Sequence, residues 1–151
     1  MQKYLLNVLY QGANYAGYDF DNLPLPVALV AAQQQIEQEA DRARTTVMGD
    51  PLRVVEYQLA EAEASAYQAA GFVGDAPKTV QAVVDAEGIE PQQAVQNILV
   101  EAQSWRDALY AIRTARLVGK QAVLKATSHA EAEASADTAI NAIRASVPGV
   151  V

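Results

Sequence analysis

The chain of 151 residues contains no cysteine, one histidine and one tryptophan, and aromatic residues make up only 7% of it. The absence of cysteine excludes a disulfide framework, a thiolate zinc site and a cysteine nucleophile. No run of about 18 apolar residues occurs, and the first residues lack the basic and apolar regions of a signal peptide, so we expect neither a membrane span nor a leader. The hydrophobic content of 51% rests largely on 30 alanines, which favours closely packed helices over a β-sandwich.

Residues that usually carry catalysis or ligand binding are absent or scattered. His129 has no companions at metal-ligand spacing, and we expect it on the surface. The chain has neither a phosphate-binding loop nor a Gly-x-Ser-x-Gly turn. Acidic residues recur at intervals of two in three groups: Glu37, Glu39 and Asp41; Glu61 and Glu63; Glu131 and Glu133. Members of such a group point in different directions along a helix, so we interpret them as solvated faces and predict no catalytic residue, no metal site and no cofactor.

The net charge of −7 is unevenly distributed along the chain. Residues 1–50 carry a charge of −3, residues 51–104 carry −6, and residues 105–151 carry +2. This acidic balance argues against general nucleic-acid binding, which requires a basic surface. The acidic middle and the basic later segment could attract each other within one chain or between copies, or both could be ordinary solvated helix faces.

The first 24 residues differ from the rest because they hold four of the seven tyrosines. The alternation of apolar residues predicts a strand over residues 3–10, turn residues predict a turn over 11–14, and a returning strand is expected over 15–20. Leu5 and Leu9 alternate with the apolar residues of the other strand face, so we expect this strand to be covered on both sides. The prolines at 24 and 26 then stop both strand and helix. We therefore divide the chain into an N-terminal β element and linker, 1–24, and a helical domain, 25–151.

Apolar spacing and capping residues predict the helices of the second part. We expect helices over about 27–46, 51–70, 77–86, 91–125 and 128–145. Asp50 and Ser128 are the expected N-caps, the latter in a capping box with Glu131. Pro148 and Gly149 are expected to end regular structure. The predicted fold is mainly α, a bundle of four or five helices with a small N-terminal β-hairpin or strand.

Two of these helices carry informative apolar patterns. The helix over 51–70 has a narrow seam that predicts close helix approach, within the chain or across a dimer. The seam consists of Leu52, Val55, Leu59, Ala62, Ala66 and Ala69. The helix over 91–125 has a core stripe in which Trp105 is the expected largest anchor. That stripe consists of Ala94, Ile98, Trp105, Leu109, Ile112 and Val123.

The candidate partner-binding residues lie in the N-terminal element and on the long helix. They are Tyr4, Tyr10, Tyr15, Tyr18, Phe20, Arg113 and Arg116. Aromatic residues are enriched at interfaces, and a single hairpin either packs on the helical body or donates an edge strand to a partner. Arg116 projects within the apolar sector of its helix, so its guanidinium pairs with an acid of a neighbouring helix or anchors an acidic partner.

Residues 55–125 resemble a helical module in short tailed-phage proteins encoded with tail fibre genes, described as tail fibre assembly proteins or tail chaperones. The matching features are the loop Gly71-Phe72-Val73-Gly74 with Pro77, the pair Gln93-Ala94, then Trp105 and the run Ile112-Arg113-Thr114-Ala115-Arg116-Leu117. The chain departs from that pattern near Val83, where a tryptophan is expected and absent.

The resemblance implies a non-enzymatic protein that binds a phage fibre or another tail component, in the host cytoplasm during assembly or in the virion. A structural virion subunit of the tail or fibre attachment is one alternative. A small regulatory protein that binds a host factor through its acidic surface is another. Homo-oligomerisation is compatible with each of these functions, and we expect no nucleic-acid or membrane partner.

Overall fold

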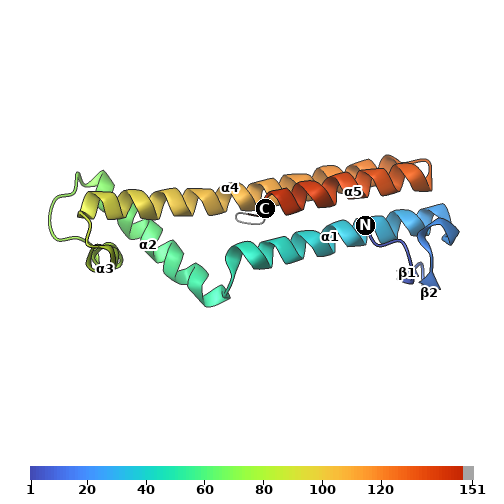
Figure 1. Ribbon diagram of the computed structural model, residues 1–151, viewed down its shortest axis with the longest axis horizontal. Coiled ribbons are helices and arrows are strands. Elements are labelled where there is room, and N and C mark those ends of the chain that lie inside the picture. Colours follow the sequence, from blue (N-terminus) through green and yellow to red (C-terminus); the bar gives the residue numbers. More distant parts are fainter. Residues whose placement is uncertain (148–151) are drawn as a thin grey trace. The chain divides into compact units, whose positions relative to one another are not determined.

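The computed structural model describes residues 1–147, in which five α-helices follow a two-stranded β-sheet. The elements are β1 (Leu6–Tyr10), β2 (Ala13–Tyr18), the 3-10 turn η1 (Phe20–Asn22), α1 (Leu25–Met48), α2 (Pro51–Ala69), α3 (Lys78–Glu87), α4 (Pro91–Lys125) and α5 (His129–Ala145) (Figure 1). The predicted fold, mainly α with a small N-terminal hairpin, is confirmed. The chain end expected at Pro148 and Gly149 lies outside the described residues.

Contacts divide the chain into two compact units. The first comprises Met1–Val47 and the residues from Ala108 onward, and the second comprises Met48–Asp107. Helix α4 therefore contributes its first half to the second unit and its second half to the first. The boundary at residue 24, expected from composition, stays a prediction.

The hairpin of the first unit is shaped by two glycines. Gln11 and Gly12 form a two-residue turn with φ of 48° and 82°, the positive values that a type I′ hairpin turn requires. Gly17, with φ of 75°, lies at a register shift between Leu6 and Asn7, where its N–H donates to the Asn7 side chain at 3.1 Å. Strand β2 begins two residues earlier than predicted because the tight turn needs only two residues.

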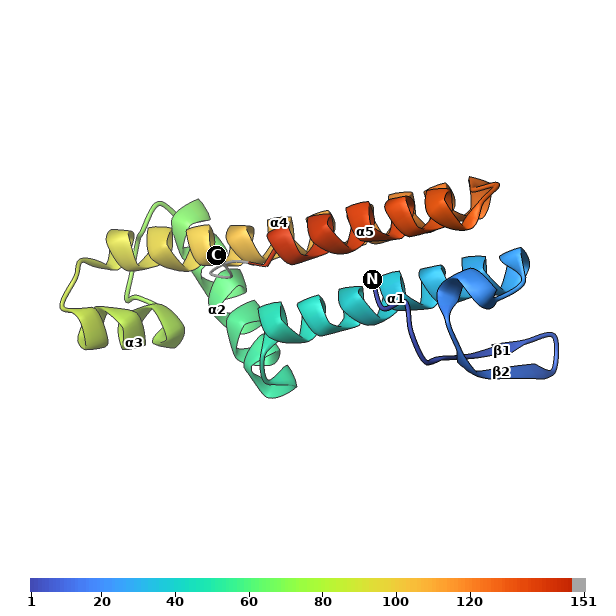
Figure 2. The same ribbon diagram turned by 45° about the vertical axis from the view of Figure 1, so that its right-hand side comes forward.

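The core of the first unit lies between α1, α5 and the second half of α4, which run side by side (Figures 1 and 2). Helix α1 buries a face of residues spaced by three and four, which includes Ala32, Ile36, Ala40 and Ala43. Its fully buried partners on α4 are Ile112 and Val123. Helix α5 contributes Ala132, Ala136, Ala139, Ile140 and Ile143. Short side chains on α1 and α5 allow the three helices to approach closely.

Gly119 lies where α4 approaches α5 closely. A Cβ atom placed on this residue would lie 2.2 Å from the Cβ of Ala139 and 3.4 Å from Cδ1 of Ile36 on α1. No carbon pair tolerates the shorter of these separations, because non-bonded carbons rest about 3.5–4.0 Å apart. The absence of a side chain at Gly119 is therefore a requirement of the packing.

The second unit is built from α2, α3 and the first half of α4 around a small core. The buried members of that core are Ala64, Tyr67, Val80, Ala94 and Val95. The loop after α2 closes on it, because the ring of Phe72 packs edge-on against Tyr67 with centroids 5.4 Å apart. Glu63 of α2 accepts hydrogen bonds from the N–H and the hydroxyl of Thr79 at the start of α3, at 3.2 and 2.6 Å.

Helix ends follow the capping signals of the sequence. The Asp50 carboxylate accepts from the N–H of Leu52 at 2.8 Å, as an N-cap does. Ser128 accepts from the N–H of Glu131 at 3.2 Å, and Glu131 reaches back to the N–H of Thr127 at 2.7 Å. Both expected N-caps are confirmed, although Glu131 bonds one residue further back than a standard capping box requires.

Candidate protein-interaction surface

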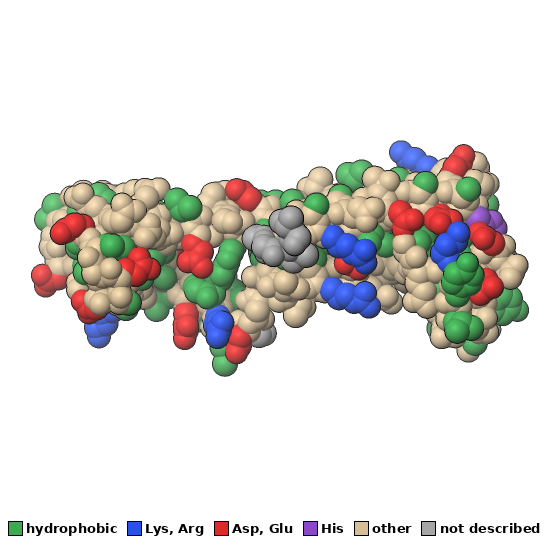
Figure 3. Space-filling model, viewed as in Figure 1, with side chains coloured by type: hydrophobic (Ala, Val, Ile, Leu, Met, Phe, Trp, Pro, Cys, Tyr) green, Lys and Arg blue, Asp and Glu red, His purple; other side chains and the backbone are tan. Residues whose placement is uncertain are grey.

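The hairpin exposes large apolar side chains in the first unit. Tyr4, Leu5 and Leu9 are 68%, 71% and 69% exposed, and Tyr18 is 43% exposed. We call these four residues the hairpin surface. Tyr18 lies at its border, because it pairs with Leu6 in the sheet and its ring lies 5.7 Å from that of Tyr15. Figure 3 shows hydrophobic side chains gathered over β1 and β2. The prediction that the strand is covered on both sides is wrong, because the helices cover only the face that carries Leu6 and Val8.

The remaining aromatic candidates face the helical body. Tyr10 and Tyr15 are partly buried and pack against the core of the first unit. Phe20 is fully buried, and its ring lies edge-on to His129 with centroids 5.7 Å apart. This burial removes Phe20 from the residues that can contact a partner, because η1 turns back and the N–H of Phe20 donates to the carbonyl of Lys3 at 2.7 Å.

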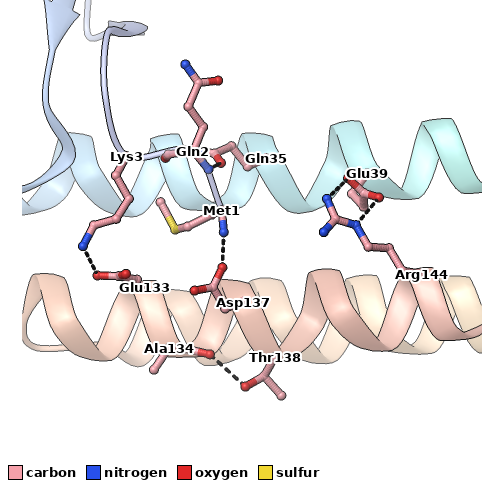
Figure 4. Close-up of polar contacts among 10 residues, drawn as sticks. All are labelled: Met1, Gln2, Lys3, Gln35, Glu39, Glu133, Ala134, Asp137, Thr138 and Arg144. Atoms are coloured by element: carbon pink, nitrogen blue, oxygen red, sulfur yellow. Dashed lines mark hydrogen bonds and ion pairs between the residues drawn. The ribbon is translucent and has the colours of Figure 1, made fainter.

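Residues preceding β1 fix the hairpin to two helices (Figure 4). The Met1 ammonium group pairs with Asp137 of α5, and Nζ of Lys3 lies 2.9 Å from the Glu133 carboxylate. The Glu133 carboxylate also raises the pKa of Lys3. On the α1 side, the backbone of Gln2 exchanges hydrogen bonds of 2.6 and 2.9 Å with the Gln35 side chain. These contacts hold the residues before β1, and with them the hairpin surface, against α1 and α5.

The two arginine candidates lie in different environments on α4. Arg113 is exposed. Arg116 is 18% exposed and donates to Glu37 of α1 at 2.7 Å, and Lys120 donates to the same carboxylate at 2.8 Å. The structure therefore pairs Arg116 with an internal acid, which was one of its two interpretations, and leaves Arg113 available to a partner. Hydrogen bonding to Lys120 and the nearby Arg116 charge hold the pKa of Glu37 below its usual value.

Other acidic residues also join helices, which corrects their interpretation as solvated faces. Glu39 of α1 accepts two hydrogen bonds from Arg144 of α5, at 2.8 and 3.1 Å. These bonds hold the pKa of Glu39 below its usual value and raise that of Arg144. In the second unit, Glu61 of α2 pairs with Arg106 of α4. These pairings could not be predicted from spacing, since the partners lie far apart along the chain.

Two single-copy residues are placed differently from expectation. His129 is partly buried, not a surface residue, and its Nε2 donates to the carbonyl of Leu23 at 2.8 Å. Trp105 was expected to be the largest core anchor, but it is only partly buried. Its ring lies edge-on to Tyr57 of α2 with centroids 4.1 Å apart. Both residues therefore secure contacts between elements at the margin of a core.

Side chains with catalytic or metal-binding chemistry do not converge in the described part of the chain. Within residues 1–147, no group of three or more His, Asp or Glu side chains is placed to hold a metal ion. A groove of about 340 Å³ between α4 and α5 is lined by nine residues, none of them titratable. The feature best suited to binding is the hairpin surface, which is apolar and open.

Comparison of the chain with protein-family models, curated proteins and solved structures found no match. Among the helices of residues 1–147, none combines the length and the apolar character that crossing a membrane requires.

Proposed function

We propose that this chain is a non-enzymatic, chaperone-like assembly protein of a tailed phage that binds a tail fibre or another tail component through the hairpin surface. The main support for this proposal is the exposure of the hairpin surface, Tyr4, Leu5, Leu9 and Tyr18, on a hairpin tethered to α1 and α5. The resemblance of residues 55–125 to phage tail assembly proteins supports the class of partner.

Backbone conformation separates this surface from an ordinary solvent-facing strand. Leu5 has φ of 55°, a left-handed conformation that costs a leucine about 1 kcal/mol. The left-handed backbone of Leu5 redirects the chain between the tether at Lys3 and the start of β1, and it leaves the leucine side chain 71% exposed. We assign this exposed side chain to a contact made outside the chain. The free edges of β1 and β2 add unpaired backbone groups for an extended partner segment.

The energy available from this surface is suited to reversible binding. Covering one exposed leucine contributes about 1–2 kcal/mol when its present partial burial is allowed for. Replacing Leu9 by threonine keeps a strand-forming residue and removes much of this contribution. Affinity for the partner should then fall about tenfold, since about 1.4 kcal/mol corresponds to that factor.

The test is affinity capture by the full chain, by Leu9→Thr and by the matched control Val73→Thr, from lysate of phage-producing cells. Val73 is 78% exposed in the loop after α2, so its replacement removes similar apolar area from another surface. We expect a tail or fibre protein to be captured by the full chain and the control, and poorly by Leu9→Thr. Equal capture by all three would refute the role of the hairpin surface, and capture of a host factor alone would refute the assembly function.

A second readout concerns what happens to the protein after assembly. A chaperone leaves its client, so purified particles should lack this chain when examined by mass spectrometry. Its presence at a fixed stoichiometry would instead identify a structural subunit of the virion.

A further inference from the structure

Helix α2 is apolar on two faces, and the second unit buries only one of them. Ala64 and Tyr67 lie in the core of the second unit, and Tyr57 packs on Trp105. The opposite face is exposed. It consists of Leu52, Val55, Leu59, Ala62, Ala66 and Ala69, which we call the α2 seam. A helix that is apolar on both faces is typically covered on both.

The α2 seam has the spacing of a helix-pairing surface. Its residues follow one another at intervals of three, four, three, four and three, as the a and d positions of a heptad repeat do. The three large members, Leu52, Val55 and Leu59, are 76%, 64% and 53% exposed. The sequence predicted a close helix approach here, within the chain or across a dimer, and no helix of the second unit covers this face.

The order of side-chain sizes indicates what covers it. All three large residues lie in the first half of the seam, and all three alanines lie in the second half. The order reverses about a point between residues 60 and 61: Leu59 mirrors Ala62, Val55 mirrors Ala66, and Leu52 mirrors Ala69. Two antiparallel copies of α2 would therefore place a large side chain against an alanine in every layer, which keeps the helices evenly spaced.

Parallel pairing lacks this complementarity. It would set Leu52 against Leu52 at one end of the seam and Ala69 against Ala69 at the other. The helices would be pushed apart at the first end and would leave a gap at the second.

We propose that the α2 seam binds the α2 seam of a second copy of this chain, antiparallel, about a two-fold axis that passes between residues 60 and 61. Such an interface is isologous, because each copy contributes the same residues to it and the pair is closed. The contact requires no phage or host partner, so it stands or falls separately from the proposed function.

The charges beside the seam give this dimer a distinctive salt dependence. Glu56 and Glu63 border it on one side, and Gln58 and Ser65 border it on the other. Antiparallel pairing brings like-charged borders together, so salt should strengthen the association by screening them. A basic helix as partner would show the reverse, because salt weakens attraction between opposite charges.

The interface is small, which sets the conditions of the test. The seam spans 18 residues, from Leu52 to Ala69, or about 27 Å of helix. Sedimentation of the full chain should therefore cover about 10 µM to about 1 mM, the range in which small interfaces form. We expect a reversible species of twice the 16.2 kDa chain mass, with association that strengthens at higher salt. A chain that stays monomeric throughout, or an association that weakens with salt, would overturn the proposal.

Ala66→Leu separates the two orientations without threatening the fold, because Ala66 is exposed and leucine favours helix. In the antiparallel pair the new leucine meets Val55 of the other copy twice, so we expect dimerisation to weaken at least about tenfold. In a parallel pair it would meet its own copy and strengthen the contact. Ala111→Leu, at an exposed alanine of α4, is the matched control and should leave dimerisation unchanged.

Cross-linking locates the register directly, since the natural chain has no cysteine. A mixture of Leu52→Cys and Ala69→Cys proteins should form a disulfide between the two different chains. Leu52→Cys alone should not cross-link, because the two copies of that residue would lie about 25 Å apart along the helices. Efficient cross-linking of Leu52→Cys to itself would overturn the antiparallel arrangement.

Discussion

Replacement of Gly119 by alanine provides a strict test of the packing in the first unit. The added Cβ would lie 2.2 Å from the Cβ of Ala139. Non-bonded carbons rest about 3.5–4.0 Å apart, so α4 and α5 would have to separate by more than about 1 Å. Because these helices meet through short side chains, that separation would loosen contacts along the whole pair.

The expected magnitude follows from two opposing terms. Alanine is favoured over glycine within a helix by about 1 kcal/mol, which would stabilise the variant if space were available. Overpacking a closely packed site costs about 1–3 kcal/mol, and two backbones must move here, so the upper end applies. We therefore expect Gly119→Ala to lower the free energy of unfolding by about 2 kcal/mol.

Urea denaturation followed by helical circular dichroism measures this change, and a second variant identifies its cause. Removing the opposing Cβ with Ala139→Gly should restore room for the alanine at position 119. The double variant should then be less destabilised than the sum of the two single variants, by about 1 kcal/mol or more. A Gly119→Ala protein as stable as the natural chain, or more stable, would refute the close approach of α4 and α5.

Three further variants test other parts of the structure. Leu5→Asn should raise stability by about 0.5–1 kcal/mol in thermal unfolding while weakening partner capture, because asparagine tolerates the left-handed backbone and lacks the apolar side chain. The pKa values of Glu37 and Glu39 are lowered in the folded chain, so their ion pairs should stabilise it above the ordinary carboxyl pKa of 4.5. This stability should be lost as the pH falls through the lowered pKa values, and Glu39→Gln should reduce the loss in urea titrations between neutral and acidic pH. Trp105→Ala should cost about 1.5–3 kcal/mol in urea denaturation, less than a fully buried tryptophan would, because Trp105 is only partly buried.

Helix boundaries were the most predictable part of the fold, since they depend on local chemistry. The limits of α4, from Pro91 to Lys125, match the prediction. Asp50 and Ser128 cap the helices that they were expected to cap. A proline, a capping side chain or a left-handed glycine acts on its immediate neighbours, so a short stretch of sequence contains the necessary information.

Contacts between distant residues were beyond the reach of such patterns. The anomaly of Arg116 was visible in the sequence, but its acceptor, Glu37, lies 79 residues away. Spacing along one helix cannot single out one acid among the 18 acidic residues of the chain. The division into two units was not anticipated for the same reason, because α4 passes through both without any break in its pattern.

For the candidate site, the sequence could not predict which of two apolar faces the chain itself covers. Alternation showed that both faces of β1 are apolar, and coverage on both sides was the natural prediction, yet Leu5 and Leu9 are exposed. Conversely, Phe20 had the chemistry of a binding residue and is buried against His129. Apolar periodicity indicates that a face is buried, but it does not indicate whether the same chain or another one covers that face.

Helix α2 also has two apolar faces, and for this helix the structure shows which of them the second unit buries. The face with Ala64 and Tyr67 is buried within the second unit, so the heptad-spaced face is the one left for another molecule. The reversal of large and small residues along that face is a property of one sequence matched to itself, and an unrelated partner would give no reason for it. The hairpin surface is assigned to a different protein because the resemblance of residues 55–125 implies such a partner, and the α2 seam is assigned to a second copy because of its size reversal.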